Sequence, residues 1–521
     1  MSIAKFDSPY EPKKTEAKIY KLWEESGFFA PEAHQPRADN PNAHKTYTIM
    51  LPPPNVTGSL HMGHALNATV QDVLIRKKRM EGYRALWLPG TDHAGIATQN
   101  VVEKQLKKEG MSRHDLGREK FLEKVWEWKE KYGNIILDQL KRLGASCDWS
   151  RTVFTMDPGY QEAVKAAFEH YHKKGLIYQG ERVINWCARC ATSLSDLELE
   201  YEEEKGTLYF IRYPFTESSK FIVVATTRPE TMLGDTAVAV HPEDARYKAL
   251  VGKMVTLPIQ EKEIPVIADS AVEKEFGTGA VKVTPGHSIA DFEIGERHKL
   301  PVVKIIDERG NMTKASKICE GLGVDECRAK VVETLKGAGL LEKEEPLAHN
   351  VAHCYRCGKV VEQLVSKQWF VKMSTLAKEA ADAVRSGAVR FHPKNFEKQY
   401  LDWLSNTKDW CISRQIWWGH KIPLEGVDDV LDTWFSSALW PFATLGWPPR
   451  QKSGASLAQK GRAPKSDLET FYPTQVLSTG RDIINLWVSR MIISGLEFVG
   501  EIPFSDVYIH PTVLAKDGRR M

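Results

Sequence analysis

Residues 46–64 read T-Y-T-I-M-L-P-P-P-N-V-T-G-S-L-H-M-G-H, and this stretch decides the fold around it. Thr46 to Leu51 is short, β-branched and apolar, and three prolines follow it, which is typical of a buried strand that stops abruptly. Residues 55–59 then predict a turn. From Leu60 to about Met80 apolar residues recur at helical spacing. The unit is therefore a strand, a loop and a helix.

The rest of the chain extends this pattern and interrupts it. A second strand, Ala85 to Leu88, is followed by T-D-H-A-G at residues 91–95, just past a strand's carboxyl end, where open α/β sheets bind ligands. Residues 206–304 are short β-branched runs between Gly, Pro and charged turns, the last run being Val302 to Ile306, which predicts a separate strand-rich domain. From residue 428 strands and helices alternate again, as if an interrupted α/β sheet were being completed.

Composition limits the class of protein. A length of 521 residues predicts several domains, and 71 Lys and Arg against 68 Asp and Glu exclude both a histone-like polycation and an acidic disordered chain. Any nucleic-acid surface must be a local patch. The N-terminus lacks the apolar stretch of a signal peptide, and no 18 apolar residues run together, so we expect no membrane span and a cytoplasmic location.

Eight cysteines are too few for a disulfide scaffold in a chain of this length. Four of them form two C-x-x-C pairs, Cys187 with Cys190 and Cys354 with Cys357, which together predict a closed, structural zinc site with four thiolates. Unmetallated thiols are the alternative. Catalytic zinc is excluded because four thiolates leave no open position. The remaining cysteines are expected to be ordinary apolar core residues: Cys147, Cys319, Cys327 and Cys411.

His61 and His64 lie three residues apart at the first turn of the predicted helix, so both imidazoles share one face beside exposed backbone N–H groups. Such a helix start favours phosphate, and imidazole donors can strengthen their hydrogen bonds as charge develops on a reacting phosphate. An isolated H-x-x-H is more often a half-exposed pair or a stray metal pair. The surrounding sequence decides between these interpretations.

That surrounding sequence is residues 52–64 together with L-P-G-T-D-H-A-G-I-A-T-Q at residues 88–99. It closely resembles the valyl-tRNA synthetases, a family of class I aminoacyl-tRNA synthetases. The isoleucyl family shares the H-x-G-H pattern, but the P-P-P-N-V-T-G and L-D-T-W-F-S-S runs look like the valyl branch. The resemblance covers nearly the whole chain and continues through residues 142–150, 226–231, 277–285, 417–420, 430–440 and 506–510.

The resemblance implies a Rossmann-type, parallel-sheet α/β catalytic domain that joins valine to ATP, with Mg²⁺, as valyl-adenylate and transfers valine to tRNA(Val). It implies that His61 and His64 contact the ATP phosphates and that Asn55 and Thr57 line the same mouth. Asp92 would pair with the ammonium group of valine, although a helix cap or surface acid is the alternative for it. The remaining positions implied are Asp482 at the ribose and, as apolar pocket walls that could equally be core residues, Pro53, Trp434 and Ile483.

The strand-rich, β-barrel-like insertion resembles the family's editing domain. An apolar pocket excludes isoleucine by size but not threonine, which has nearly the shape of valine, so hydrolysis of threonyl-tRNA is needed. The resemblance implies an editing pocket formed by Thr226, Arg228, Thr231, Glu273, Lys282, Thr284 and Asp291. Ser288 stands where the valyl pattern commonly has Asp, so recognition of the threonine hydroxyl can differ. A β-domain kept only as a tRNA clamp is the alternative.

These predictions divide the chain as follows. The two halves of the Rossmann domain are residues 1–150 and 426–521, and the editing domain is residues 206–345. Two connective segments with one zinc knuckle each, residues 151–205 and 346–425, lie between them. At Arg520-Met521 only the opening of the family's K-M-S-K-S-type loop is reached, so we expect weak adenylate formation by a monomer. The alternatives are a chain that acts only as an editing hydrolase or tRNA-binding module, a zinc-bound scaffold and an isoleucyl-type synthetase.

Overall fold

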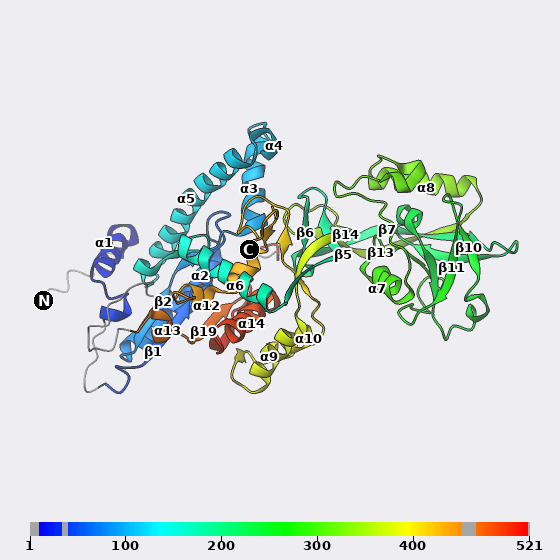
Figure 1. Ribbon diagram of the computed structural model, residues 1–521. Coiled ribbons are helices and arrows are strands. Elements are labelled where there is room, and N and C mark those ends of the chain that lie inside the picture. Colours follow the sequence, from blue (N-terminus) through cyan, green and yellow to red (C-terminus); the bar gives the residue numbers. More distant parts are fainter. Residues whose placement is uncertain (1–9, 34–39, 450–464, 519–521) are drawn as a thin grey trace. The chain divides into compact units, whose positions relative to one another are not determined.

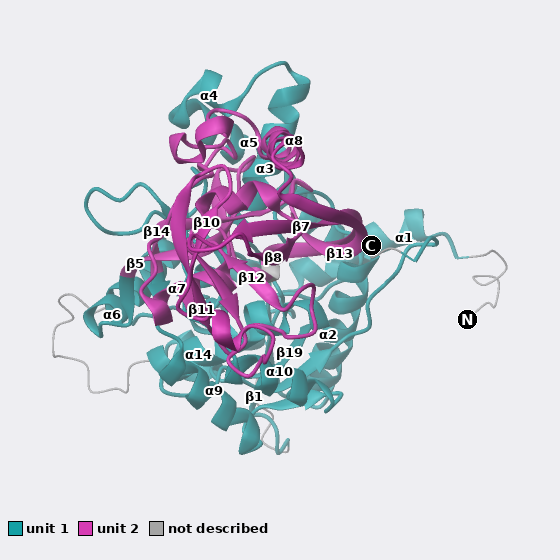
Figure 2. Ribbon diagram, turned by 90° about the vertical axis from the view of Figure 1, so that its right-hand side faces the viewer, with its two compact units in different colours: residues 1–178, 370–521 teal, residues 179–369 magenta. Residues whose placement is uncertain are grey.

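A computed structural model of the protein describes residues 10–33, 40–449 and 465–518. The chain divides into two compact units (Figure 2): unit 1 comprises residues 1–178 and 370–521, and unit 2 comprises residues 179–369. Strands β5 (Ile177–Cys187) and β14 (Glu362–Val371) carry the chain from one unit to the other. Arg520 and Met521, on which the expectation about the K-M-S-K-S-type loop rests, lie outside the described residues.

Unit 1 is built on a five-stranded parallel sheet in the order β15-β20-β19-β1-β2. Strands β2, β1 and β19 of this sheet are labelled in Figure 1. The chain moves from β1 to its neighbour β2 in one direction and from β19 to its neighbour β20 in the other. The strand order therefore reverses between β1 and β19, and this is the position at which doubly wound sheets bind ligands beyond the carboxyl ends of their strands. The five strands are β1 (Thr46–Met50), β2 (Arg84–Leu88), β15 (Arg390–His392), β19 (Thr474–Thr479) and β20 (Phe504–Ile509).

The first strand, loop and helix form where the sequence predicts them. β1 is buried along four of its five residues, as a central parallel strand requires, and the prolines that follow end it. Helix α2 (Met62–Met80) begins two residues later than predicted because His61 caps it. Its inner face meets the sheet through Gln71, whose Oε1 accepts a hydrogen bond from Nε1 of the fully buried Trp87 at 3.0 Å.

Helices and short strands complete unit 1 around this sheet. Right-handed crossovers put α2, between β1 and β2, and α14 (Ser489–Phe498), between β19 and β20, on opposite faces of the sheet. The remaining helices are α1 (Pro12–Glu25), α3 (Gly95–Lys108), α4 (Arg113–Leu116), α5 (Arg118–Arg142), α6 (Pro158–Lys173), α9 (Ser374–Arg385), α10 (Phe396–Ser405), α11 (Thr433–Ser437), α12 (Trp440–Ala443) and α13 (Asp467–Phe471). The short strands are β3 (Gly90–Thr91), β4 (Val153–Phe154), β16 (Trp410–Cys411), β17 (Ser413–Arg414) and β18 (Val430–Leu431).

Unit 2 is strand-rich, as predicted. One sheet has the order β13-β7-β8 and is antiparallel, and a second has the order β10-β11-β9-β12, with only the β11–β9 pair parallel. In a further sheet β6 pairs antiparallel with β5. The elements are β6 (Thr192–Leu194), β7 (Leu199–Pro214), β8 (Phe221–Thr226), β9 (Ala237–Val240), β10 (Met254–Leu257), β11 (Lys262–Ala268), β12 (Ala280–Val283), α7 (Ile289–His298), α8 (Val324–Gly337) and β13 (Leu341–Cys354).

The predicted run Val302 to Ile306 does not form a strand; only Ile306 makes an isolated bridge, to Met312. The imidazole of His287 is the physical reason. Its Nε2 accepts hydrogen bonds from the backbone N–H groups of Ile305 at 2.8 Å and Ile306 at 3.3 Å. A side chain therefore takes the place that a neighbouring strand would otherwise fill.

Two of the cysteines expected to be plain core residues are bonded to each other. Cys319 and Cys327 form a disulfide between a short 3-10 turn and helix α8, with their Cα atoms 5.3 Å apart. Eight residues separate them along the chain, and nothing in that spacing distinguishes a bonded pair from two buried thiols. Cys147 is buried and Cys411 half-buried, and neither belongs to a disulfide.

None of the described helices is both long enough and apolar enough to cross a membrane.

Candidate functional site

The loops that follow β1 and β2 run side by side at the carboxyl edge of the parallel sheet. Asn55 and Asp92 form a parallel bridge, in which the N–H of Val56 donates to the Asp92 carbonyl at 3.1 Å and the N–H of Asp92 to the Pro54 carbonyl at 3.0 Å. The prolines before Asn55 therefore lead the chain directly past the T-D-H-A-G segment. Asn55 is exposed and Thr57 half-buried beside it.

His61 and His64 are held in a reciprocal capping arrangement at the start of α2. Nδ1 of His61 accepts from the Gly63 N–H at 3.1 Å, and Nδ1 of His64 accepts from the His61 N–H at 3.3 Å. Because Nδ1 is the acceptor in both rings, each neutral ring carries its proton on Nε2. The ring centroids lie 4.0 Å apart, so two Nε2–H donors stand together at a helix N-terminus.

Burial keeps this pair neutral. It lowers the pKa of His61, and it lowers the pKa of His64 to about 4, with the neighbouring His61 and His510 adding to the effect. Gly63 is required here, since a Cβ at that position would lie 2.9 Å from Cε1 of His61. The arrangement offers an anion hydrogen bonds and a helix dipole rather than a fixed positive charge.

The loop after β19 meets the end of β20 on the other side of the switch point. The N–H of His510 donates to the Thr479 carbonyl at 3.0 Å, and a Cβ on Gly480 would lie 2.8 Å from Oδ1 of Asp482 and 3.8 Å from Cε1 of His510. Asp482 is exposed and Ile483 half-buried. His510 was not among the predicted site residues; its only signal was its place in the segment 506–510 that carries the family resemblance.

Asp92 is a buried carboxylate, 3% exposed, whose hydrogen bonds all come from neutral groups. Oδ1 accepts from the Ala94 N–H at 2.6 Å and from Oγ1 of Thr433 at 3.1 Å, and Oδ2 accepts from Oγ of Ser437 at 2.6 Å. No Lys or Arg among the described residues forms an ion pair with it. Burial raises the pKa of Asp92, and these hydrogen bonds oppose that rise.

Asp92 is neither a helix cap nor a surface acid. Its bond to the Ala94 N–H is a turn bond just before α3, whose N-cap is Ala94 and which has no side-chain cap hydrogen bond. The bonds to Thr433 and Ser437 come from α11, more than 300 residues further along the chain, and hold a negative charge that lacks a cation. Sequence reasoning missed both hydroxyls, although their spacing of four within L-D-T-W-F-S-S is the spacing of neighbours on a helix face.

The three predicted pocket walls lie near the same sheet edge. Pro53 is half-buried in the loop after β1, and Ile483 follows β19. Trp434 lies on the first turn of α11, and its indole Nε1 is buried without a hydrogen-bond partner. Their grouping around one substrate remains a prediction.

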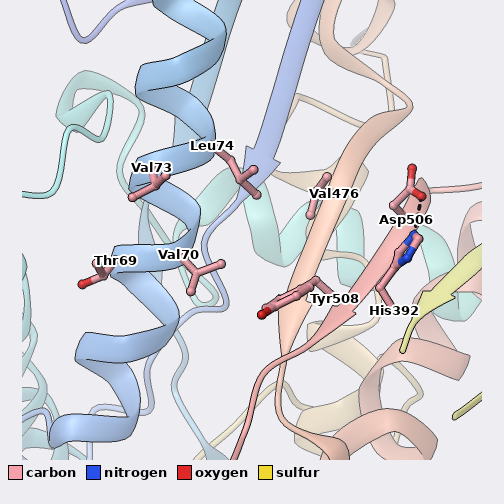
Figure 3. Close-up of a pocket in the computed structure, with 8 residues that line it drawn as sticks. All are labelled: Thr69, Val70, Val73, Leu74, His392, Val476, Asp506 and Tyr508. Carbon is pink, nitrogen blue, oxygen red and sulfur yellow. Dashed lines mark hydrogen bonds and ion pairs between the residues drawn. The ribbon is translucent and has the colours of Figure 1, made fainter. Parts of the chain in front are cut away.

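One open apolar pocket lies elsewhere on unit 1 (Figure 3). It has a volume of about 490 Å³ and is lined by Thr69, Val70, Val73, Leu74, His392, Val476, Asp506 and Tyr508. The charged groups at its rim are already paired, with Nε2 of His392 2.8 Å from Oδ1 of Asp506. None of the predicted site residues lines this pocket, so the chemistry predicted from the sequence does not belong to it.

In unit 2 a buried polar cluster joins three of the predicted editing residues. Nζ of Lys282 donates to Oγ1 of Thr284 at 2.6 Å, the Thr284 hydroxyl donates to Oδ1 of Asp235, and the Thr284 N–H donates to Oδ2 of Asp291 at 2.8 Å. Asp235, which the sequence reasoning missed, also accepts from the Tyr213 hydroxyl at 2.8 Å. Burial raises the pKa of Asp235 to about 6, although Lys282 opposes the rise.

Arg228 belongs to a second cluster in unit 2 and is already ion-paired. Its guanidinium contacts Glu230 at 3.0 Å and Glu362 at 2.5 Å, and Arg328 contacts the fully buried Glu230 at 2.8 Å. Two carboxylates therefore face the cation that the resemblance assigns to the editing pocket.

Two other predicted editing residues, Thr226 and Thr231, form hydrogen bonds with the backbone of Arg228. Oγ1 of Thr226 accepts from the Arg228 N–H at 3.0 Å, and the Thr231 hydroxyl donates to the Arg228 carbonyl at 2.9 Å. Glu273 is exposed, and within the described residues no hydrogen bond or ion pair joins its side chain to the cluster around Lys282. Ser288 caps α7, accepting from the Asp291 N–H at 3.2 Å, so serine serves here as a helix cap.

The four cysteines of the C-x-x-C pairs gather into one cluster, as predicted from their spacing. One pair follows β5 and the other follows β13, and all four Sγ atoms lie within 4.8 Å of one another. A tetrahedral zinc site with Zn–S bonds of ~2.3 Å would place the sulfurs roughly 3.8 Å apart. The donor set and its spacing therefore fit a structural zinc ion.

Comparison with known proteins gives the family. Residues 18–427 and 423–521 match tRNA synthetases class I (I, L, M and V). The valine–tRNA ligase of Carboxydothermus hydrogenoformans is 53% identical over 541 residues, covering 99% of this chain and 59% of that protein. The valine–tRNA ligases of Geobacter sulfurreducens and Bdellovibrio bacteriovorus are 52% and 51% identical, each over 98% of this chain and 58% of theirs. The chain thus spans about three-fifths of the length of these curated relatives, and it belongs to the class I tRNA synthetase family that comprises the I, L, M and V enzymes.

Proposed function

We propose that unit 1 carries the amino-acid-activating site of a valine–tRNA ligase, which joins valine to ATP as valyl-adenylate and then transfers valine to tRNA(Val). The observation that carries this proposal is the buried Asp92 carboxylate, which lacks a cation and lies at the same sheet edge as the two imidazole donors of α2. The carboxylate suits an ammonium ion, and the imidazole donors suit a phosphate chain. The identity to valine–tRNA ligases supports valine as the amino acid.

Each residue then has a defined part in the first reaction. The ammonium group of valine pairs with Asp92, which fixes the substrate's carboxylate toward ATP. A carboxylate oxygen forms a bond to the α-phosphorus, the bond from that phosphorus to the bridging oxygen breaks, and pyrophosphate leaves with the electron pair. The Nε2–H groups of His61 and His64 donate to phosphate oxygens, and these bonds strengthen as negative charge builds up. Mg²⁺ accompanies ATP as part of the substrate.

Binding of a non-reactive adenylate tests this assignment. Valyl-sulfamoyl-adenosine replaces the phosphate of valyl-adenylate with a stable sulfamate. We expect the 521-residue protein to bind it, and Asp92→Asn to bind it at least tenfold more weakly because the ammonium group loses its charged partner. Failure of the wild-type protein to bind this compound would exclude the proposed activity.

Unit 2 supports a second function, the hydrolysis of threonyl-tRNA(Val). An apolar pocket separates valine from threonine by only about a hundredfold, the valyl enzyme being itself the usual example of this limit. The cluster of Lys282, Thr284, Asp235 and Asp291 is buried and holds two carboxylates next to one cation, which is suited to an aminoacyl ester. Asp291 receives the ammonium group, a water molecule attacks the ester carbonyl, and threonine and free tRNA leave.

Pre-formed threonyl-tRNA(Val) tests the second function separately. The protein is expected to deacylate it without ATP, and to leave valyl-tRNA(Val) largely intact. Asp291→Ala should abolish this hydrolysis. If the wild-type protein leaves threonyl-tRNA(Val) intact, unit 2 acts as a tRNA-binding module.

The four-cysteine cluster is proposed to hold one structural Zn²⁺ ion with Cys187, Cys190, Cys354 and Cys357 as its ligands. The ion would fix the two turns to each other and takes no part in either reaction. The substrates named above favour a cytoplasmic protein, and we propose that it acts as a monomer.

A further inference from the structure

Thr433 and Ser437 are the only described side chains that donate hydrogen bonds to Asp92. They stand at the first and last residues of α11, one helical turn apart, so both hydroxyls lie on the same face of the helix. Each binds a different oxygen of the carboxylate, Thr433 binding Oδ1 and Ser437 binding Oδ2. Together with the Ala94 N–H, which donates to Oδ1 at 2.6 Å, the pair sets both the position and the rotation of the carboxylate plane.

The start of α11 is itself fixed by a buried ion pair. The carboxylate of Asp432 accepts from the Trp434 N–H at 3.3 Å, from Nε1 of Trp410 at 2.9 Å and from Nη2 of Arg414 at 3.1 Å. The side chains of Asp432 and Arg414 are each 1% exposed. A buried ion pair of this kind adds little net stability compared with apolar residues, whereas it can specify a single geometry. Here the geometry specified is that of the helix that carries Thr433 and Ser437.

We propose that Thr433 and Ser437 are positioning residues for Asp92: they orient the carboxylate that receives the substrate's ammonium group and supply the hydrogen bonds that favour its ionised form. This inference rests on the proposed activation of an amino acid in unit 1. It assigns no direct contact between the two hydroxyls and the substrate. Their effect is instead confined to ligands that carry an ammonium group.

Two ligands that differ in one group separate this role from a general structural one. Valyl-sulfamoyl-adenosine carries the ammonium group, and isovaleryl-sulfamoyl-adenosine is the same compound without the amino group. Titration calorimetry with the 521-residue protein gives the ratio of their affinities, which measures what the ammonium group contributes. In Ser437→Ala we expect this ratio to fall about tenfold, because a hydrogen bond to a charged group is lost, while the affinity for the isovaleryl compound changes less than twofold.

Thr433→Val is the second test variant, and it serves if Ser437→Ala folds poorly. It replaces the hydroxyl by a methyl group of nearly the same shape and keeps α11 intact. Ser437→Thr, which keeps a hydroxyl, should restore most of the ratio. Ser436→Ala is the matched control: it lies on the same helix, and its hydroxyl donates to the Thr433 carbonyl at 2.9 Å rather than to Asp92. We expect it to leave the ratio unchanged.

The outcomes are distinguishable. A ratio that falls in Ser437→Ala and Thr433→Val but not in Ser436→Ala supports the inference. If the wild-type ratio is well above one and neither test variant lowers it, the inference is overturned and the proposed function still stands. If the wild-type protein binds neither compound, or binds both equally, the proposed role of Asp92 itself is wrong.

Discussion

At the scale of single residues, the proposed binding of an amino acid depends on one buried carboxylate, that of Asp92. Asp92 is surrounded by groups that do not titrate near neutral pH: burial lowers the pKa of His93 and of His420 to about 3, and burial raises the pKa of Tyr160. Ala94, Thr433 and Ser437 contribute only neutral donors. These groups around Asp92 therefore keep one charge state between mildly acidic and neutral pH, and they do not account for a change in ammonium binding there.

The pH dependence of binding follows from the sign of this shift. Burial raises the pKa of Asp92 above its usual value, and only the ionised form attracts an ammonium group. Affinity for valyl-sulfamoyl-adenosine should accordingly decline as pH falls through that raised pKa. Removing the Ser437 donor raises it further, so the decline in Ser437→Ala should begin at a higher pH. Titrations from pH 4 to 8 would show this, and superimposable wild-type and variant profiles would contradict it.

His64 at the start of α2 has two roles that can be tested separately: its Nε2–H is a donor to phosphate, and its Nδ1 is an acceptor in the helix cap. Glutamine places an N–H near the position of Nε2 in histidine, and asparagine places its polar atoms near Nδ1. His64→Gln keeps the donor to phosphate, whereas His64→Asn keeps the acceptor for the His61 N–H. We expect ATP affinity to fall only a few-fold in the first and about tenfold in the second. The reverse order, a larger loss in His64→Gln than in His64→Asn measured by calorimetry, would mean that the ring serves only the cap.

Individual residues were predictable from sequence to the extent that they stand in short motifs. His61, His64 and Asp92 follow strands and start helices, and those positions can be inferred from the chain itself. Thr433, Ser437 and Asp235 were missed because their partners lie far away along the chain or in another strand, which local pattern does not encode. Arg228 was predicted as an editing-pocket residue, but only the fold brings Glu362 to it.

At the scale of elements, local chemistry decides where segments begin, end and pair. β1 ends at its prolines and α2 begins at its histidine cap, and both could be expected from sequence. The run 302–306 has strand-like residues yet forms no strand, because the imidazole of His287 satisfies its N–H groups. Propensity alone could not reveal this, since the competing acceptor comes from a distant turn.

The paired cysteine turns give a prediction at the same scale. Metal analysis of the purified protein should find one zinc ion per chain, and Cys357→Ser should lower that content sharply. Cys411→Ser should not, because Cys411 lies outside the cluster. Because binding energy at such a site is folding energy, removal of zinc with a chelator should lower the melting temperature. Full stability and no bound zinc in the wild-type protein would show that the thiols act without metal.

At the scale of the whole molecule, the sequence indicated an α/β sheet interrupted by a strand-rich insertion, and the structure has both. The order of the strands was not predictable, because it depends on which distant segments pair. It is this order, reversing between β1 and β19, that places the loops containing Asn55 and Asp482 at one switch point.

The division into two units predicts a double dissociation. Asp291→Ala in unit 2 should abolish hydrolysis of threonyl-tRNA(Val) and leave the binding of valyl-sulfamoyl-adenosine within twofold of wild type. Asp92→Asn in unit 1 should do the reverse. Parallel deacylation and calorimetry measurements on the two variants would decide this, and loss of both activities in either variant would show that the two functions are not separable.

The most direct test of the central claim is the selectivity of the unit 1 site for its amino acid. Titration calorimetry with valyl-, threonyl- and isoleucyl-sulfamoyl-adenosine compares the three side chains on one scaffold. The account predicts that the valyl compound binds tightest, the threonyl compound up to ~10²-fold more weakly, and the isoleucyl compound at least ~10-fold more weakly because its extra methylene overpacks the pocket. Isoleucyl binding as tight as valyl binding, or tighter, would contradict it.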